Sequence, residues 1–150
     1  MVTSTSHIGY APDTTQLFPY LTGYEQMKLV WDLHQSEVKK PRSQEAKKHL
    51  SSLLEQVGLD ADNTTRVAKY SAGMKKRLGL AMSLVGDPDF LIWDEPMAGV
   101  DPLGRITIKN VINHLKSQGK TLLFSTHILS DVEEVANDFA IIHHGRLLYN

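Results

Sequence analysis

Two hydrophobic patterns divide the chain into a helical region and a region of alternating elements. From about Thr22 to Gly86, apolar residues recur every three or four positions. From about Phe90 to Asn150, short apolar runs alternate with amphipathic stretches. The first pattern is typical of helices with one buried face, and short apolar runs are typical of buried strands. The chain is therefore expected to form a helical part followed by an α/β part.

Two of the expected helices carry clear signals at their ends. Thr22 is followed three residues later by Glu25, which is a capping box, so a helix is expected to begin there. Pro41 breaks this pattern, and a second helix is expected after Ser43. Gly58 suits the position just past its end. The apolar positions of this second helix share one face: Ala46, Leu50, Leu53, Leu54 and Val57.

The rest of the chain is expected to alternate between helix and strand. The run 90–93 is expected to be a strand buried on both faces, and 121–125 a second buried strand. Strands that alternate with helices predict a parallel α/β core. The other expected elements are helices at about 72–84, 102–118 and 128–136, and two strands, 139–143 and 146–149, around a turn at 144–145.

Composition narrows the class of protein without identifying it. The chain has 150 residues, of which 41% are hydrophobic and 22% charged, and this suits one soluble domain with a core. Its formal net charge of -1 gives no reason to expect a nucleic-acid partner. The absence of cysteine excludes disulfides and fits a cytosolic protein. We see no signal peptide and no apolar stretch near the ~20 residues that cross a bilayer.

The clearest candidate for chemistry is a pair of acids, Asp94 and Glu95, at the end of the expected strand 90–93. Adjacent strand residues point to opposite faces, and ligands bind at the carboxyl edge of open α/β sheets. In a nucleotide hydrolase, the first acid would hold Mg²⁺ and the second would orient or deprotonate the attacking water. The alternative is a strand that ends in a solvated acidic turn.

Three further positions are candidates for the same site as these acids. Ser71 opens a helix with the small residues Ala72 and Gly73, where backbone N–H groups could bind an oxyanion. Asp101 precedes a proline at the expected start of another helix. Both Ser71 and Asp101 could equally be ordinary N-caps. His127 follows an expected strand, where it could contact a phosphate or be a polar loop residue.

The order and spacing of these motifs resemble the ABC ATPase family from about residue 7 to the end of the chain. Residues 70–74 resemble the signature motif, and 91–95 resemble Walker B with its catalytic glutamate. Residues 98–101 resemble the D-loop, and His127 resembles the switch histidine. Residues 8–12 resemble the strand that leads into the Q-loop.

The resemblance implies a role for each of these residues. Asp94 would coordinate Mg²⁺, Glu95 would polarise the hydrolytic water, and His127 would contact the γ-phosphate of ATP. Residues 71–73 would bind the γ-phosphate of an ATP held by the opposite subunit of a dimer. Asp101 would help to couple the two sites across that dimer.

Two positions depart from the usual family pattern. Where the family signature usually reads Leu-Ser-Gly-Gly-Gln, Ala72 adds a methyl group and Met74 lacks a polar side chain. At the Q-loop, Asp13 stands where glutamine is usual. A carboxylate there could bind Mg²⁺, directly or through water, but it cannot donate a hydrogen bond.

The family's phosphate-binding loop, Walker A with the pattern G-x-x-x-x-G-K-[ST], does not occur in this sequence. Residues 119–121 resemble its end, but His114 stands where its first glycine belongs. They also precede an expected strand, whereas this loop follows one. The chain is therefore expected to be a fragment with no appreciable ATPase activity alone, because half of the phosphate cradle is missing.

The implied fold class is α/β, a partial P-loop NTPase core with a parallel sheet and flanking helices, plus the ABC helical subdomain. Residues 1–21 would hold the strand and Q-loop region of the core. Residues 22–86 would form the helical subdomain with the signature motif. Residues 87–150 would be the C-terminal part of the core.

The implied function is that of the ATP-hydrolysing subunit of an ABC transporter, with ATP and Mg²⁺ as cofactors. Its partners would be a second nucleotide-binding domain and transmembrane permease subunits, which would hold it at the cytoplasmic face of the cell membrane. Residues 17–21 would lie near the groove that receives a helix of the membrane subunit, or would simply pack as a loop.

Two other functions remain open from the sequence. One is a non-transport ABC ATPase acting on ribosomes or DNA. The short stretch between Q-loop and signature, and the lack of a basic face, count against it. The other is a non-enzymatic module that supplies only the signature side of a dimer. A missing half of the core would also leave apolar surface exposed.

Overall fold

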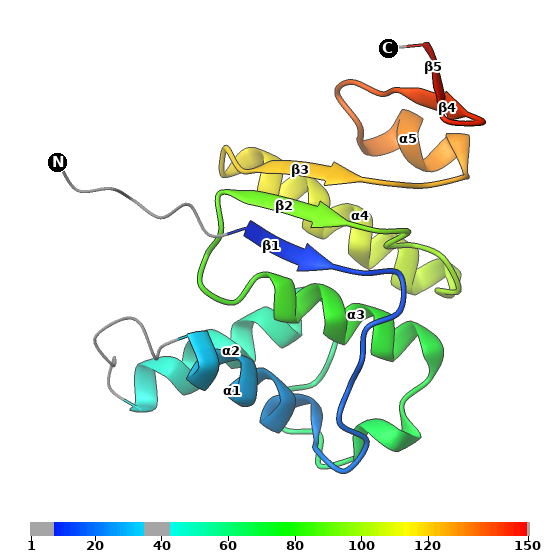
Figure 1. Cartoon of the computed structure of the whole chain (residues 1–150). Helices are drawn as coiled ribbons and strands as arrows, with labels where there is room; N and C mark the ends of the chain where they lie inside the picture. The colour runs from blue at the N-terminus through cyan, green and yellow to red at the C-terminus, as the bar shows by residue number, and fades with distance from the viewer. Residues whose placement is uncertain (1–7, 35–42, 150) are drawn as a thin grey trace, which may run out of the picture.

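The computed structural model describes residues 8–34 and 43–149 of the chain (Figure 1). The helix break expected at Pro41 lies outside these residues. Among the helices of this part of the chain, none is long and apolar enough to cross a membrane. A short 3₁₀ helix at Val67–Lys69 was not expected from the sequence. The α-helices are α1 (Gly23–His34), α2 (Ser43–Gln56), α3 (Ala72–Ser83), α4 (Pro102–Ser117) and α5 (Leu129–Val135).

A three-stranded parallel sheet contains β1 (Ile8–Ala11), β2 (Phe90–Trp93) and β3 (Thr121–Phe124), in that order. Ala11 pairs with Trp93, and Trp93 pairs with Phe124, at the carboxyl ends of the strands. All three strands therefore end at one edge of the sheet. The segments that follow them, which carry Asp94, Glu95 and His127 among other residues, begin side by side (Figure 1).

The predicted helix starts are confirmed by side-chain caps. At α1, the Thr22 N–H donates to Glu25 Oε2 over 2.8 Å, and the Glu25 N–H donates to Thr22 Oγ1 over 3.2 Å. Ser71 caps α3 by accepting from the Met74 N–H over 3.1 Å. Asp101 caps α4 by accepting from a backbone N–H in its first turn. Local sequence thus determines where these helices begin.

Helix α3 joins the helical region to the sheet. Leu78, Leu80 and Ala81 are buried in the shared core. At its end, Ser83 accepts a hydrogen bond of 2.9 Å from the indole N–H of Trp93, which is itself fully buried. A side chain at Gly9 would place its Cβ 2.2 Å from the Ser83 carbonyl oxygen. The last turn of α3 is therefore packed directly against β1 and β2.

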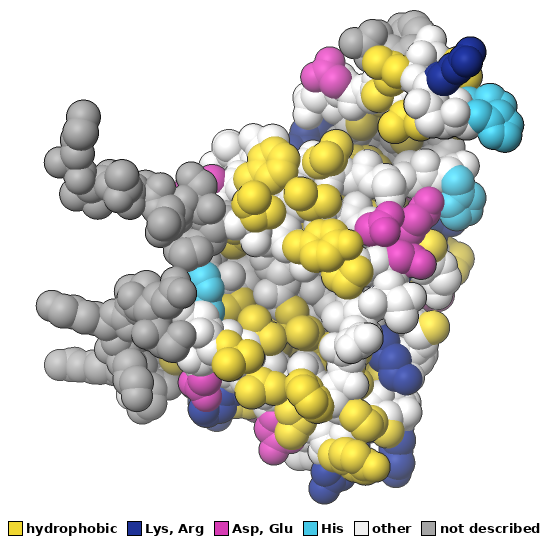
Figure 2. Space-filling view, viewed as in Figure 1, with side chains coloured by type: hydrophobic (Ala, Val, Ile, Leu, Met, Phe, Trp, Pro, Cys, Tyr) yellow, Lys and Arg dark blue, Asp and Glu magenta, His cyan; other side chains and the backbone are white. Residues whose placement is uncertain are grey.

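One face of the sheet is covered by α3 and α4, and the opposite face is not covered by any described element. On the open face, Ile8 is 60% exposed, Tyr10 58% and Leu123 59%. Figure 2 shows apolar side chains gathered over the strands in this view. The prediction that 90–93 is buried on both faces, and 121–125 likewise buried, is wrong. The expectation that apolar surface is exposed to solvent is confirmed.

The two strands expected around a turn at 144–145 are confirmed, but they do not extend the parallel sheet. β4 (Ile141–His143) and β5 (Arg146–Tyr149) pair only with each other, antiparallel. The two turn residues between them, His144 and Gly145, have φ angles of 47° and 71°. Positive φ at both residues is the geometry that matches the twist of a tight hairpin. The backbone hydrogen bonds of β4 and β5 are therefore made within the hairpin and not with β3.

A buried ion cluster fixes α5 against α4. The side chain of Asp131 is 0% exposed and accepts two hydrogen bonds of 2.7 Å from Arg105 Nη2. Lys109 Nζ lies 3.2 Å from Asp131 and 2.7 Å from Glu134. Burial raises the pKa of Asp131, but the hydrogen bonds and charges of Arg105 and Lys109 outweigh it, so the pKa lies below its ordinary value.

Candidate functional site

The two acids lie at the carboxyl end of β2, as the sequence predicts. The backbone N–H of Asp94 donates to the carbonyl oxygen of Ala11 over 2.8 Å, which continues the pairing of β2 with β1. Asp94 is exposed, whereas the side chain of Glu95 is 25% exposed. Glu95 has a φ angle of 47°, in the left-handed region that non-glycine residues seldom occupy. This turn redirects the chain immediately after the metal-binding candidate.

Ser125 connects both acids, and sequence reasoning gave it no role. Its hydroxyl donates to Asp94 Oδ1 over 2.6 Å and accepts from the backbone N–H of Glu95 over 2.9 Å. Its own N–H donates to the carbonyl of Trp93 over 3.0 Å, just beyond the end of β3. The only signal in the sequence is a hydroxyl residue at the end of a strand that neighbours the acidic one.

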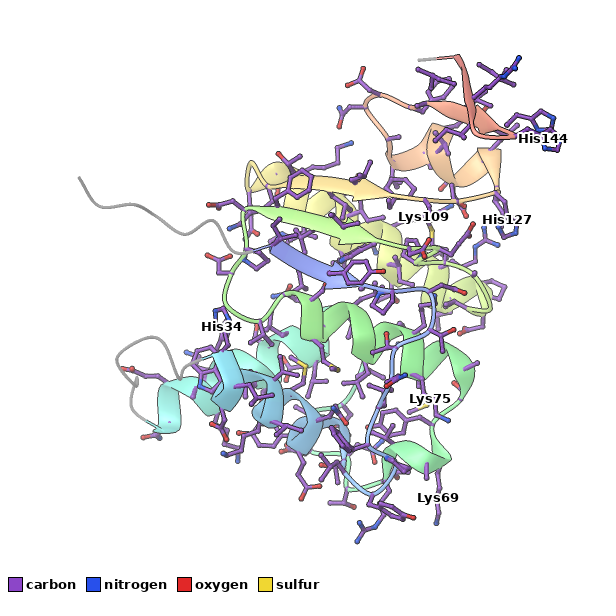
Figure 3. The ribbon with its side chains drawn as sticks, in the orientation of Figure 1. His34, Lys69, Lys75, Lys109, His127 and His144 are labelled. Carbon is purple, nitrogen blue, oxygen red and sulfur yellow. The ribbon has the colours of Figure 1, made fainter. Side chains whose placement is uncertain are left out.

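His127 lies on the loop that follows β3 (Figure 3), within hydrogen-bond distance of Glu95. Its Nδ1 is 3.0 Å from both carboxylate oxygens of Glu95, and its side chain is 70% exposed. An ionised carboxylate can only accept hydrogen bonds, so the tautomer of His127 with its proton on Nδ1 is the one that matches this contact. Nε2 is left for a ligand. The structure thus brings together His127 and Glu95, which are 32 residues apart in the sequence.

We call the carboxyl ends of β2 and β3, with Asp94, Glu95, Ser125 and His127, the acid edge. This edge could hold Mg²⁺ together with a nucleotide, but it does not form a complete metal site by itself. Within the described residues, no group of three or more His, Asp or Glu side chains could hold a metal ion. Mg²⁺ in nucleotide sites is usually bound through one or two carboxylates, with waters and phosphate oxygens completing its shell. The exposed carboxylate of Asp94 can supply one such ligand.

A second group of candidate residues forms where α3 begins. Ser71 and Ala72 are exposed there, and Gly73 is buried. A Cβ at Gly73 would lie 3.5 Å from Asp101 Oδ1, so Asp101 stands against the first turn of α3. The first N–H groups of a helix lack partners within the helix and can bind an anion. The structure therefore brings residues 71–73 and Asp101 together.

Asp13 belongs to neither group by its contacts. Its carboxylate lies 2.8 Å from Lys76 Nζ, and its backbone carbonyl accepts from the same ammonium group. Lys76 is on α3, so the Q-loop position is paired with the signature helix. A role of Asp13 in binding Mg²⁺ remains a prediction.

The segment 119–121, which resembles the end of a phosphate-binding loop, is a connection between α4 and β3, as expected. Gly119 has a φ angle of 76°, which suits the position after a helix. Lys120 Nζ lies 2.9 Å from Asp87 and 3.1 Å from Asp89. This lysine holds two strand-entry loops together.

Comparison with known proteins identifies the family in which these motifs occur. A protein-family model for ABC transporters matches residues 1–98, which include the candidate signature motif and both acids. The chain belongs to the ABC transporter family. Asp101 and His127 lie beyond the matched ABC segment.

Several named ABC proteins are similar to this chain over nearly its whole length. An uncharacterised ABC transporter ATP-binding protein of Synechocystis is 38% identical, covering 94% of the chain and 39% of that relative. The bacitracin transport ATP-binding protein BcrA of Enterococcus faecalis is 33% identical, covering 95% and 44%. The lantibiotic transport ATP-binding protein SrtF of Streptococcus pyogenes is 37% identical, covering 94% and 58%. The chain thus spans about half the length of these relatives.

A solved structure supports the ABC fold. The post-hydrolysis, dimeric state of the ATP-binding cassette MJ0796, bound to ADP and phosphate, matches with a TM-score of 0.75. The match has 21% sequence identity and covers 85% of this chain and 55% of that one. At this identity, the likeness establishes the fold alone, which is that of an α/β P-loop NTPase with its helical subdomain.

Replacing Ser125 with alanine is expected to lower the free energy of unfolding by about 1 kcal/mol, because two hydrogen bonds at the acid edge are lost. Urea denaturation followed by circular dichroism measures this change. Ser52→Ala is the matched control, because Ser52 is exposed on α2, and its effect is expected to stay within about 0.5 kcal/mol. Equal effects of the two substitutions would show that the bridge through Ser125 contributes no stability.

Proposed function

We propose that this chain supplies the acid edge and the signature helix of an ATP-hydrolysing ABC transporter subunit. The observation that carries the proposal is a connected set of polar groups at the carboxyl ends of β2 and β3. Ser125 bridges Asp94 and the Glu95 backbone, and the Glu95 carboxylate contacts His127. Membership of the ABC family and the names of the relatives support the same function.

In this proposal, each residue of the edge has one task. Asp94 would hold a Mg²⁺ ion bound with ATP, which would supply charge stabilisation for the phosphates. Glu95 accepts a hydrogen bond or a proton from the attacking water. His127 keeps the Glu95 carboxylate in place through Nδ1 and presents Nε2 to the γ-phosphate. Ser125 fixes the separation between the metal-binding acid and the water-binding acid.

The start of α3 would act on a second nucleotide. Ser71, Ala72 and Gly73 would bind the γ-phosphate of an ATP held by another nucleotide-binding domain, because a helix N-terminus attracts an anion. Asp101 lies against this turn and caps α4, so it would couple a movement of the turn to α4. The dimeric state of the solved neighbour supports pairing of this kind.

Membrane-spanning permease subunits are the other proposed partners, at the cytoplasmic face of the membrane. Phe18 is 57% exposed and Tyr20 is 75% exposed on the loop between β1 and α1. Large apolar side chains on one exposed loop suit contact with another protein. Two relatives are named for bacitracin and lantibiotic transport, which supports a role with membrane partners.

The proposal is tested by giving the acid edge a phosphate-binding loop. In the joined protein, a strand and helix segment that carries the pattern G-x-x-x-x-G-K-[ST] precedes residue 1 of this chain. We expect it to hydrolyse ATP with Mg²⁺ and to lose this activity when EDTA is added. A folded joined protein that binds ATP without hydrolysing it would contradict the proposed function.

A further inference from the structure

The loop that follows β1 is attached to the sheet and to α3 at positions only two residues apart. Ala11 accepts a hydrogen bond from the Asp94 N–H over 2.8 Å. Asp13 is bound by Lys76 through both its carboxylate and its carbonyl oxygen. The Cα atoms of residues 11 and 13 can be at most about 7 Å apart. A movement of α3 is therefore transmitted to the end of β1 unless the contact with Lys76 breaks.

The contact with Lys76 is more than a surface ion pair. The side chain of Lys76 is 9% exposed, although that of Asp13 is 56% exposed. Loss of the Asp13 carboxylate would leave a mostly buried ammonium group with the backbone carbonyl as its one acceptor on this residue, which is unfavourable. One turn further along α3, a Cβ at Gly79 would come within 2.2 Å of Thr15 Oγ1. The loop is thus held at two points on one face of α3.

The other end of α3 is fixed separately. Ser83 is bound to Trp93 and packed against Gly9, as described above. Lys76 lies about 10 Å along the helix from Ser83, at 1.5 Å per residue. Ser71 lies about 7.5 Å beyond Lys76 in the other direction. The signature end of α3 is also held by Arg77, which donates to the carbonyl oxygens of Val57 and Gly58. The contact with Asp13 is the one that ties this end of the helix to the loop after β1.

We propose that Lys76 is a positioning residue, which sets the angle of α3 and so places Ser71 and Gly73 relative to the acid edge. A continuous set of contacts runs from Asp94 through Ala11 and Asp13 to Lys76. The importance of the α3 start rests on the proposed function, whereas the contacts themselves do not. Any ligand or partner that draws Asp13 from Lys76 removes the tie between the loop after β1 and the signature end of the helix.

Hydrogen exchange of the purified chain without nucleotide tests this proposal. Lys76→Met removes the ammonium group and keeps a long side chain. We expect amides in the first two turns of α3 and in residues 13–16 to exchange at least about tenfold faster. Amides in the last turn of α3, beside Ser83, are expected to keep their exchange rates. Circular dichroism establishes that each variant is folded.

Two further variants separate positioning from general destabilisation. Lys76→Arg keeps a cationic donor and is expected to restore the original exchange rates to within about threefold. Lys28→Met removes an exposed ion pair with Asp32 on α1, where the side chains are 57% and 56% exposed, and is expected to leave α3 unchanged. If Lys76→Met does not fold, Asp13→Asn is measured instead, because it removes the charge and keeps the backbone acceptor.

Three results would overturn the proposal: unchanged exchange at the start of α3 in Lys76→Met, equal acceleration along the whole helix, or no rescue by Lys76→Arg. None of these measurements involves ATP. An inactive joined protein would count against the proposed function and would leave the exchange result as it stands. Normal exchange in an active protein would reject the role of Lys76 alone.

Discussion

Replacing Glu95 with glutamine is expected to lower kcat for ATP hydrolysis by the joined protein about 10²- to 10⁴-fold. Glutamine has nearly the same shape, and its oxygen can still accept from His127 Nδ1, which lies 3.0 Å from the carboxylate. It cannot take a proton from the attacking water. KM for ATP is expected to change little, because the lost interaction belongs to the transition state and not to nucleotide binding.

Steady-state release of phosphate over a range of ATP concentrations measures this effect. Glu133→Gln is the matched control, because Glu133 is exposed on α5 and away from the acid edge. It is expected to keep kcat within about twofold, as surface substitutions usually have small effects. If the Glu95→Gln variant were as active as this control, Glu95 would have no role in the mechanism.

The Asp131→Ala substitution is expected to lower the free energy of unfolding by about 3 kcal/mol. Asp131 is fully buried and receives both hydrogen bonds from Arg105 and a contact from Lys109. Its removal leaves two cations, 30% and 16% exposed, without their shared partner. Urea denaturation measures the loss. Asp32→Ala, which breaks an exposed pair on α1, is expected to cost at most about 1 kcal/mol.

This contribution of Asp131 should depend on pH in a defined direction. The pKa of Asp131 is lowered in the fold from its ordinary value of 3.8, so the fold favours the ionised form. The stabilisation is fully present above that ordinary pKa and is lost as pH falls through the lower folded pKa. The difference in stability between the original chain and Asp131→Ala is therefore expected to be constant near neutral pH and to shrink below 3.8.

Local features of the fold could be predicted because their causes are local. The capping box of Thr22 and Glu25 depends on residues three apart, and the caps at Ser71 and Asp101 need only the turn that follows each. The strand that precedes Asp94 was recognisable from four apolar residues in a row. These patterns located the candidate residues on the correct elements.

Features that depend on long-range packing could not be predicted in the same way. Ser125 reaches Asp94 only because β2 and β3 are neighbours in parallel register, and the two residues are 31 positions apart. Lys76 meets Asp13 across 63 positions. Asp131 looks like an ordinary surface acid until α4 and α5 pack together. The open face of the sheet likewise depends on which segments are present to cover it.

Family membership and the activity of this chain are separate conclusions. The acid edge and the start of α3 are built from residues present here, and each has the geometry that a nucleotide site can use. The backbone cradle that grips β- and γ-phosphates is a different structure, and its sequence pattern does not occur in this chain. Phosphoryl transfer depends on positioning and charge stabilisation from both parts.

The rate of Mg²⁺-dependent ATP hydrolysis by the purified chain alone, compared with the joined protein, tests the account most directly. We predict no turnover above the buffer rate for the chain alone and turnover that requires Glu95 for the joined protein. Steady turnover by the chain alone, abolished by Glu95→Gln, would contradict the claim that this acid edge needs a phosphate-binding loop from elsewhere.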